Sequence, residues 1–422
     1  EVGRATVDET LKNLNHFGSS DPLGIRNILG GNSLSNTAST TLQQEEGALA
    51  PAILFKLSEE RSSGISFADV LVPRTVEVRK RITIDDPLVA STSKPRKIQV
   101  MATTTETVYA TTSRIRYVEQ GSGHIYEYDY ASSSSRKLTN TTIPKTQEAY
   151  FLDNGSKVLL RYLDNTNRVI ENYLANIPTS SVADKLTGEF LPSNITAISV
   201  SPSSSEFFYI AKTSSGSVGN VYSVKSGVER RVFTSAFSEW LPSWVATGIF
   251  VTTKPASTVP GFTYLQSITK NTFTRVTGNR LGLTTNPSPD GTKVLLGEGS
   301  SLSILDVSSG ATVAIYNLNT LPEKCAWLQT SLICFASEGR SEANLPESWY
   351  QGKQYFNDSV FNINPSTGEY FFLASMSELY RKEIALDVTQ PTISKDGKTI
   401  VFINKIDVTP WYLNLEDLLS LF

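Results

Sequence analysis

Short apolar segments joined by tight turns recur along most of the chain. The clearest copy is Ser288-Pro289-Asp290-Gly291, which is followed by the apolar run Val294 to Leu296. Asp or Asn before Gly supplies the positive-φ residues of a tight hairpin turn, and β-branched residues favour the strands beside it. Similar units, some with altered turns, place turn centres near residues 154, 204, 247, 291, 330 and 397. Most of the intervals are roughly 40 to 50 residues long, which is the period of a four-stranded propeller blade.

The repeated units add up to seven blades. Blade one has its inner strand at Gly64–Val70, then a long excursion through Arg79-Lys80-Arg81, and it resumes at Ile115–Val118. In the last blade, too few residues follow Trp411–Leu415 for a fourth strand. The spare apolar segment Ala52–Leu57 precedes blade one, so we predict that it pairs with the last strand and closes the ring. Closure of this kind protects sheet edges that would otherwise be open.

The pattern therefore predicts an all-β fold, a seven-bladed β-propeller over residues 51–422 that an N-terminal strand closes. Residues 1–50 follow a different pattern, because Gly18-Ser19-Ser20 and Gly30–Ser33 interrupt any periodicity. Polar stretches rich in Gly and Ser are typical of flexible linkers. We predict a flexible N-terminal extension that acts as a tether or binds a partner.

The charge balance argues against two classes of partner. Lys and Arg number 38 and Asp and Glu number 41, which gives a net charge of -3. Nucleic-acid binding through phosphate neutralisation and polybasic attachment to a membrane both need a basic excess. The chain has no run of 18 apolar residues, so no membrane span is predicted. Its first methionine is Met101, which leaves a removed N-terminal signal or anchor open.

The chain carries little material for catalysis or for binding a metal. Two cysteines and two histidines are too few for a His/Cys metal cluster, and no phosphate-binding or dinucleotide motif occurs. His124 lies in a turn, where a structural role is the simpler interpretation, although a Ser-His-Asp triad assembled by the fold stays open. Asp153 and Asp290 belong to short turns without the spaced acidic ligands of a calcium loop. We predict no cofactor, no metal site, no catalytic residues and no enzymatic activity.

Two sets of residues resemble known propellers. Ser288–Gly291, with Lys293-Val294-Leu295 and Leu305-Asp306 after it, resembles the TolB-type repeat. Other stretches resemble a family of uncharacterised extracytoplasmic propeller proteins of candidate-phyla (Patescibacteria-type) bacteria. These stretches are Gly123–Glu127, Asn140–Lys145, Phe190–Ile195, Leu321–Cys325 and Trp349–Gly352. The resemblance implies a propeller that is secreted or lies in the cell envelope, and it implies no known reaction.

Cys325 and Cys334 flank a short hairpin. If Gln329-Thr330 is its two-residue turn, the cysteines form a directly opposed, non-hydrogen-bonded pair. Such pairs have Cα atoms about 4.5 Å apart, at the short end of the range for a disulfide. We predict a Cys325–Cys334 disulfide, which agrees with the oxidising compartment that the resemblance implies. Two reduced core cysteines are the alternative.

An aromatic insertion at residues 339–356 is the most suggestive binding feature. It contains the candidate binding residues Trp349, Tyr350, Lys353 and Tyr355. Trp and Tyr are frequent anchors of protein interfaces and also stack on sugars. The alternative is that the insertion folds over its blade and buries these aromatics. If the insertion and the basic excursion of blade one share a face, they form one mixed surface for a partner.

The favoured function is a non-enzymatic binding or scaffold module of the cell envelope that presents propeller loops to a protein or glycan partner. A structural subunit of an envelope assembly is one alternative, and a propeller hydrolase or lyase is another. The enzyme requires a cluster of carboxylates or a histidine in the central funnel. Fold alone does not decide among these hypotheses.

Overall fold

Antiparallel β-sheets make up most of the structure. The computed structural model describes residues 53–85, 97–130, 132–179, 183–270, 272–329, 331–338 and 344–422. Within these ranges the strands form seven sheets, of which six have four strands and one has five. The predicted N-terminal extension, residues 1–50, lies outside the described residues.

The strands of each sheet follow one another along the chain. The first three sheets consist of β2 (Ser62–Asp85), β3 (Lys97–Glu119), β4 (Ile125–Asp129) and β5 (Ser134–Lys137); of β6 (Thr146–Leu152), β7 (Lys157–Leu163), β8 (Ile170–Asn176) and β9 (Thr187–Leu191); and of β10 (Ile195–Val200), β11 (Glu206–Thr213), β12 (Gly216–Ser223) and β13 (Glu229–Ser235). The next two consist of β14 (Trp240–Val245), β15 (Gly248–Thr253), β16 (Pro260–Gln266) and β17 (Phe273–Leu281); and of β18 (Leu283–Pro287), β19 (Lys293–Glu298), β20 (Ser301–Asp306) and β21 (Thr312–Ile315).

The last two sheets are less regular. The sixth consists of β22 (Leu318–Asn319), β23 (Cys325–Leu328), β24 (Ser331–Glu338), β25 (Ser359–Ile363) and β26 (Tyr370–Ser375), and the seventh of β27 (Val388–Ile393), β28 (Thr399–Asn404), β29 (Pro410–Asn414) and β1 (Leu54–Lys56). The short helical elements are η4 (Asp153–Gly155), η5 (Pro322–Lys324), α1 (Glu347–Tyr350), α2 (Met376–Tyr380) and α3 (Leu415–Leu419). None of the helices in the described ranges is long and apolar enough to cross a membrane.

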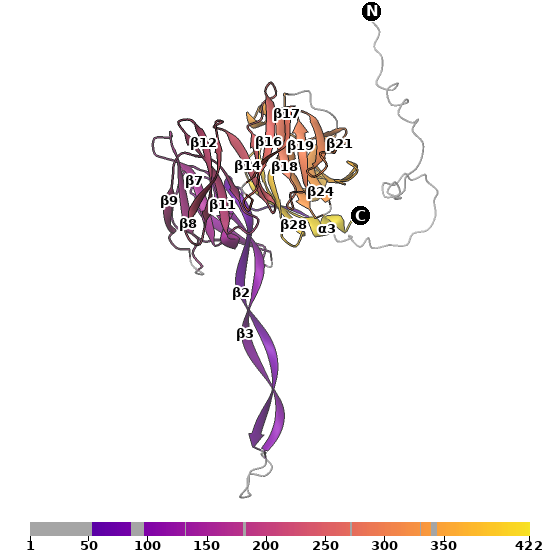
Figure 1. Ribbon diagram of the computed structural model, residues 1–422. Coiled ribbons are helices and arrows are strands. Elements are labelled where there is room, and N and C mark those ends of the chain that lie inside the picture. The colour runs from indigo at the N-terminus through magenta and orange to yellow at the C-terminus, as the bar shows by residue number, and fades with distance from the viewer. Residues whose placement is uncertain are drawn as a thin grey trace, which may run out of the picture. The chain divides into compact units, whose positions relative to one another are not determined.

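The sheets are arranged as the blades of a β-propeller (Figure 1). Strands of neighbouring sheets adjoin one another: β2 contacts β6 and β28, β10 contacts β14, β14 contacts β18, and β23 contacts β27. Apolar side chains fill the space between neighbouring sheets. One buried cluster joins Leu152 and Leu159 of the second sheet to Phe207 and Tyr209 of the third. Sheets that pack face to face around a centre in this way define the propeller class, as the sequence predicts.

The N-terminal strand β1 completes the seventh sheet. It pairs antiparallel with β29, with Leu54 opposite Leu413 and Phe55 opposite Tyr412. Leu54 is 1% exposed, and the Phe55 ring stacks on the Tyr412 ring with centroids 4.7 Å apart. The predicted pairing of this N-terminal segment with the last strand is confirmed for Leu54–Lys56, and Ala52 lies outside the described residues.

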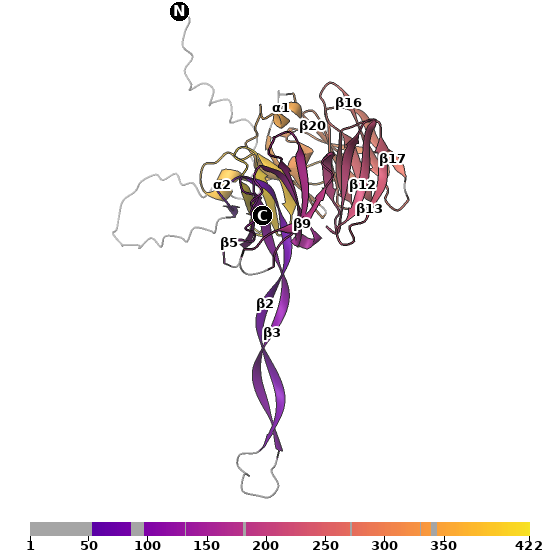
Figure 2. The same cartoon turned by 90° about the vertical axis from the view of Figure 1, so that its left-hand side faces the viewer.

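The first sheet carries a long two-stranded ribbon (Figures 1 and 2). β2 and β3 stay paired without a register shift from Gly64 opposite Val118 to Asp85 opposite Lys97. The long excursion predicted between Val70 and Ile115 is therefore present, and it is a continuous hairpin in which the first two strands of the blade stay paired. We define the ribbon as residues 70–85 of β2 and 97–112 of β3. In the described part of the chain, no further strand pairs with it.

The ribbon takes the place of the first turn of blade one. In other blades a short turn joins the first two strands, and the turns of neighbouring blades adjoin. The Asn154 backbone N–H donates a hydrogen bond to Ser204 Oγ (2.8 Å). Lys395 Nζ donates to Asn154 Oδ1 (3.1 Å) and to Asp69 Oδ2 at the base of the ribbon (2.6 Å). The ribbon therefore leaves the propeller at the end where these first turns lie.

The aromatic insertion lies at the other end. It joins β24 and β25, which are the second and third strands in the spatial order of the sixth sheet because β22 and β23 both pair with β24, whereas the ribbon joins a first and a second strand. Consecutive strands of these sheets are antiparallel, so successive connections alternate between the two ends of a blade. The insertion and the ribbon therefore lie at opposite ends of the propeller. They do not form the single binding surface that would have combined the aromatic insertion with the basic excursion of blade one.

Candidate binding site

A cavity of about 510 Å³ opens at the end of the propeller that carries the ribbon. Its lining comes mainly from the first strands and first turns of blades one, two, three and seven. It includes Asp69 and Ser113 at the base of the ribbon, Glu148 of β6, and Lys395 and Asp396 of the β27–β28 turn. The cavity and the ribbon thus form one continuous candidate site.

Three carboxylates reach this cavity, and each is already engaged. The contacts are Asp69 with Lys395 (2.6 Å), Glu148 with Arg161 (2.6 Å), Glu148 with the Tyr150 hydroxyl (2.7 Å) and Asp396 with the Ser394 hydroxyl (2.5 Å). The hydrogen bond from the Ser394 hydroxyl holds the pKa of Asp396 below its usual value. Glycoside hydrolysis needs one carboxyl group that keeps its proton and one that attacks or activates water. Carboxylates held in pairs and hydrogen bonds suit recognition better than proton transfer.

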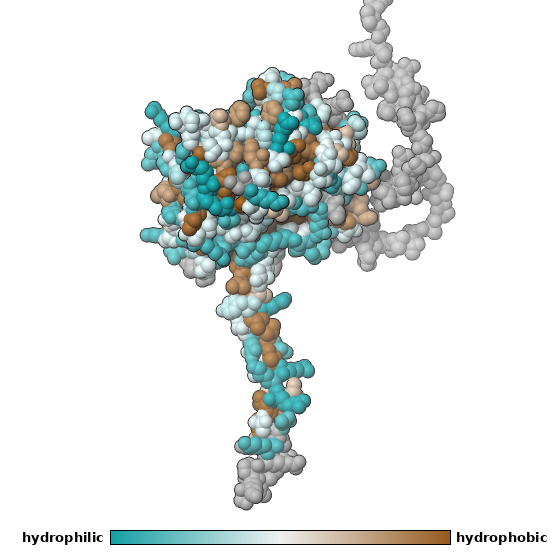
Figure 3. Space-filling model, in the orientation of Figure 1, coloured by the Kyte–Doolittle hydropathy of each residue, from teal (hydrophilic) through white to brown (hydrophobic). Residues whose placement is uncertain are grey.

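The two faces of the ribbon differ in chemistry. Even-numbered positions of both strands share one face, because Val70 lies opposite Thr112 and Ile82 opposite Val100. We call this the apolar face; its aliphatic side chains are Val70, Val72, Val76, Val78, Ile82, Ile84, Val100, Ala102, Val108 and Ala110. The other face carries mainly threonines and charged residues, with Leu71, Met101 and Tyr109 among them. Figure 3 shows apolar and polar residues alternating along the ribbon.

The apolar face lacks a cover among the described residues. None of its described side chains is buried; Ile82 is 40% exposed, Ile84 38% and Val108 40%. An exposed apolar stripe of this length is uncommon on a monomer and marks an interaction surface. Sequence analysis did not identify it as a site, although the alternation at Val70, Val72, Val76 and Val78 carries the signal.

The insertion buries one of its predicted binding residues. Trp349 is 3% exposed, whereas Tyr350 is 42% and Tyr355 50% exposed, and Lys353 is also exposed. The Trp349 ring packs in a small core, and its Nε1 donates to Asp387 Oδ2 (2.8 Å). The prediction that Trp349 is an exposed binding residue is therefore wrong, because the insertion folds onto its blade and buries this ring. A binding role for Tyr350, Lys353 and Tyr355 stays a prediction.

A buried ion cluster holds the insertion in place. Lys324 Nζ contacts Asp358 Oδ2 (2.7 Å) and Asp387 Oδ1, and all three side chains are fully buried. The ammonium group also lies over the Phe356 ring, 4.9 Å from its centroid. Asp358 Oδ2 accepts the Val388 backbone N–H (2.6 Å), while its buried Oδ1 has no hydrogen-bond partner among the described residues. The cluster ties together β25, the insertion and the connection into blade seven.

The stability of the propeller is expected to depend on Asp358 ionisation. Burial raises the pKa of Asp358 to about 6, although the positive charge of Lys324 opposes the rise and the negative charge of Asp387 adds to it. This pKa lies above the ordinary value of about 3.9. The contribution of Asp358 to the free energy of unfolding is therefore fully present below about pH 4 and is lost as the pH rises through about 6. Relative to Asp358→Asn, the wild type should lose roughly 2–3 kcal/mol of its free energy of unfolding between pH 4 and pH 7.

Denaturant unfolding of both chains at several pH values measures this difference. Two other charged groups lie beside the cluster: Lys405, whose ammonium lies over the Trp349 ring (4.7 Å) and whose pKa burial lowers, and Glu323, whose pKa burial raises. Because the two chains share every other titrating group, only the difference between their stability curves matters. Parallel curves from pH 4 to pH 7 would contradict the raised pKa.

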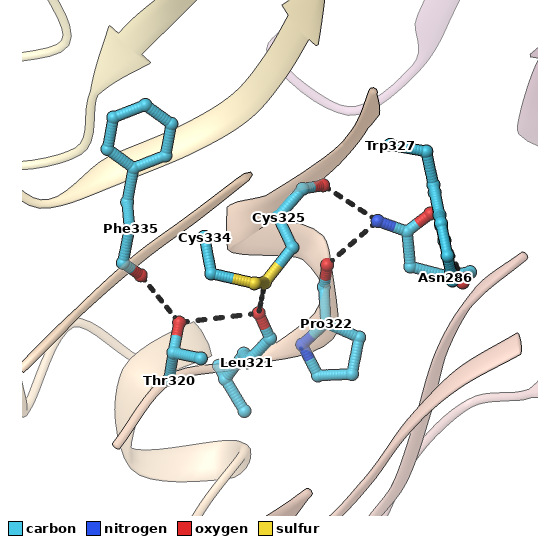
Figure 4. The surroundings of a disulfide bond; sticks show 8 residues. All are labelled: Asn286, Thr320, Leu321, Pro322, Cys325, Trp327, Cys334 and Phe335. Atoms are coloured by element: carbon cyan, nitrogen blue, oxygen red, sulfur yellow. Dashed lines mark hydrogen bonds between the residues drawn. A yellow bond between two sulfur atoms is a disulfide. The ribbon is translucent and has the colours of Figure 1, made fainter. Parts of the chain in front are cut away.

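The two cysteines form a disulfide in the sixth sheet (Figure 4). Cys325 and Cys334 are directly opposed, with Cα atoms 4.1 Å apart, and Leu328 lies opposite Ser331 across the two-residue turn. The predicted register and pairing are confirmed. Asn286 of the fifth sheet donates to the backbone oxygen of Cys325 (2.7 Å), so the bridge lies where two blades meet.

Removing the disulfide is expected to cost about 2–3 kcal/mol, because the bridge closes a loop of ten residues and limits the unfolded chain. A Cys325→Ala, Cys334→Ala chain should melt a few degrees below the wild type. The wild type should lose stability when a reductant is added, and the double variant should not respond to the reductant. Two alkylatable thiols in the unfolded, non-reduced wild type would contradict the bridge.

His124 is placed away from the cavity. Its Nδ1 lies 3.7 Å from Glu119 Oε2, and its Nε2 lies 3.3 Å from Thr142 Oγ1. Burial lowers the pKa of His124. The β3–β4 turn that carries it connects a second and a third strand and so lies at the end opposite the ribbon. These contacts are those of a turn residue.

Comparison with protein-family models and with curated proteins gives no match. Among solved structures, the chain is similar to the β-propeller domain of the Trilobed protease from Pyrococcus furiosus, with a TM-score of 0.47, 11% identity, and coverage of 72% of this chain and 93% of that one. For an oligogalacturonate lyase in complex with manganese, the TM-score is 0.46 and the identity 11%, and the match covers 82% of this chain and 99% of that one. For TolB from Acinetobacter baumannii, the TM-score is 0.40 and the identity 11%, and the match covers 72% of this chain and 77% of that one. Similarity at this level says nothing about an activity or a partner.

Proposed function

We propose that this chain is a non-enzymatic binding and scaffold module of the cell envelope, built as a seven-bladed propeller that β1 closes. The single observation that supports it most is the ribbon with its uncovered apolar face. A two-stranded hairpin is at best marginally stable alone in water. A ribbon that extends far beyond its blade therefore gains stability when a partner covers it.

The extracytoplasmic location is part of the proposal. The Cys325–Cys334 bridge supports it, because disulfides persist in oxidising compartments and are rare in the cytosol. The resemblance to candidate-phyla envelope propellers points the same way and stays a prediction. Exposed Tyr350 and Tyr355 at the end opposite the ribbon offer a second, smaller surface for a protein or glycan.

An enzymatic role is the less favoured alternative. The carboxylates of the cavity are paired or hydrogen-bonded, and the only histidine of the described part lies at the other end of its blade. A pocket that lacks a poised acid, base or nucleophile gives a hydrolase or lyase no starting point. We propose binding without turnover at this site.

A ribbon-less chain tests the proposal. Residues 71–111 are replaced by Asn-Gly, so that Val70 and Thr112, which already face each other, flank the kind of tight turn that the other blades use. This chain and the wild type serve as baits in native envelope extracts of the producing cells. The proposal expects the ribbon-less chain to fold and to lose its captured partners, while Tyr350→Ala, Tyr355→Ala keeps those that bind the ribbon. Equal capture by the wild type and the ribbon-less chain would overturn it.

A further inference from the structure

Register and composition give the apolar face a simple geometry. Each pair of opposed even-numbered residues is one rung, and every rung from Val70/Thr112 to Ile82/Val100 contains at least one aliphatic side chain. Only three charged residues interrupt the face: Arg74, Lys80 and Glu106. Lys80 and Glu106 form an ion pair across the two strands. The face is thus an apolar stripe that is interrupted by one ion pair near its middle and by Arg74.

The base of the ribbon limits how two such stripes can meet. β2 is the first strand of its blade, and Asp69 at the base of the ribbon lines the cavity between the blades. Two ribbons that lay side by side and pointed the same way would bring two propellers into the same space. Two ribbons that point in opposite directions keep the propellers at the two ends of the pair. An antiparallel arrangement is therefore the one that sterics allow.

From these observations we propose that two copies of this chain associate by packing the apolar faces of their ribbons against each other, antiparallel, about a two-fold axis at the Val78/Thr104 rung. The proposal rests on the proposed binding role of the ribbon and names its partner as a second copy.

Charge complementarity places the axis. With the axis at Val78/Thr104, the rung that holds Glu106 faces the partner's rung that holds Lys80. Two lysines and two glutamates then form a neutral group at the centre of the interface, and charge pairs of this kind fix register. Ile82 faces the partner's Arg74 rung, where the long side chain of Arg74 can reach the solvent at the interface edge. An axis at the neighbouring Val76/Glu106 rung would instead set two glutamates against each other.

The area of the face predicts a weak dimer. Fifteen residues at about 3.3 Å each make a face roughly 50 Å long, and two strands about 4.8 Å apart make it about 10 Å wide with side chains. Two such faces remove on the order of 1,000 Å² from water, which is the lower limit for a specific interface. The association is therefore expected in the micromolar range, and the ribbons must coil around each other to follow their twist (Figure 2).

Sedimentation equilibrium of the full chain tests the pairing. The mean mass should rise from 46.3 kDa towards twice that value as the concentration increases through the micromolar range. Val78→Lys brings two like charges together at the axis and should weaken association at least tenfold. Thr105→Lys, one residue from the axis but on the opposite face, is the matched control and should leave association unchanged. The pairing would be overturned by a wild type that stays monomeric at a concentration of about 100 μM. It would also be overturned by a Val78→Lys chain that associates like the control.

Crosslinking tests the axis itself. The chain has two cysteines, and both are in the disulfide, so an introduced cysteine is the single free thiol. Thr104→Cys should form a disulfide-linked dimer under mild oxidation, and Thr105→Cys should form far less. Equal crosslinking of the two would overturn the face-to-face arrangement. If the wild type is monomeric while the ribbon-less chain still loses an envelope partner, the second copy is excluded as the occupant and the proposed binding function stands.

Discussion

Replacing Lys324 by methionine is expected to lower the free energy of unfolding by about 3–5 kcal/mol, because two carboxylates would lose their buried counter-charge. Asp358 and Asp387 both contact Lys324 Nζ, and all three side chains are fully buried. Methionine is unbranched and only one heavy atom shorter than lysine, and it can still pack against Phe356, so the change removes mainly the charge. For a domain of this size the melting temperature should fall by roughly 4–6 °C.

Two further chains make this result specific. Lys398→Met is the matched control, because Lys398 forms its ion pair with Glu416 on the surface, and such pairs contribute little. It should melt close to the wild type. Combining Lys324→Met with Asp358→Asn and Asp387→Asn should recover much of the loss, because no charge is then buried alone. If the surface and buried substitutions had equal effects, the cluster would not have the stabilising role that its geometry indicates.

The blade pattern could be predicted because it depends on local chemistry. Turn residues such as Asp290-Gly291 and Asp396-Gly397 fix a hairpin within a few residues, and the structure places β18–β19 and β27–β28 on either side of them. The disulfide register followed in the same way from the two-residue turn between Leu328 and Ser331. The pairing of β1 with β29 was also predictable, since an incomplete last blade leaves an apolar strand with one available edge.

The ribbon was harder to predict because its strands contain poor strand residues. Pro73 cannot donate a ladder hydrogen bond, and the basic run Arg79 to Arg81 is typical of a loop. Both are tolerated here because β2 is an open edge along the ribbon, with β3 as its only partner in the described part of the chain. The alternation of Val70, Val72, Val76 and Val78 was legible, but a stripe that faces solvent in a monomer gives no sign of what it packs against.

The surroundings of the insertion could not be predicted from sequence at all. Asp358 and Asp387 follow Lys324 by 34 and 63 residues along the chain, and only the folded blades bring the three together. A lone lysine before a strand is normally a solvated residue. The burial of Trp349 depends on this cluster, through the hydrogen bond from its Nε1 to Asp387. Non-local ionic contacts thus decided which of the candidate aromatics stay exposed.

Deleting residues 1–57 is expected to cost roughly 4 kcal/mol or more, since the seventh sheet loses its outer strand. Burial of a leucine such as Leu54 contributes about 1.5–3 kcal/mol, and each backbone hydrogen bond to β29 adds about 1 kcal/mol net. The deletion also uncovers Tyr412, on which the Phe55 ring stacks. The melting temperature should fall by about 5 °C or more.

The control chain starts at Leu42 and keeps β1. It should melt like the full chain, because the residues removed end before the strand that pairs with β29. A full-length Leu54→Asp chain should resemble the longer deletion, since it buries an unpaired carboxylate in the last blade's core. An open β29 edge should also make the chain lacking residues 1–57 aggregate faster than the control at equal concentration. If that chain melted and aggregated like the control, the ring would not depend on β1 for its closure.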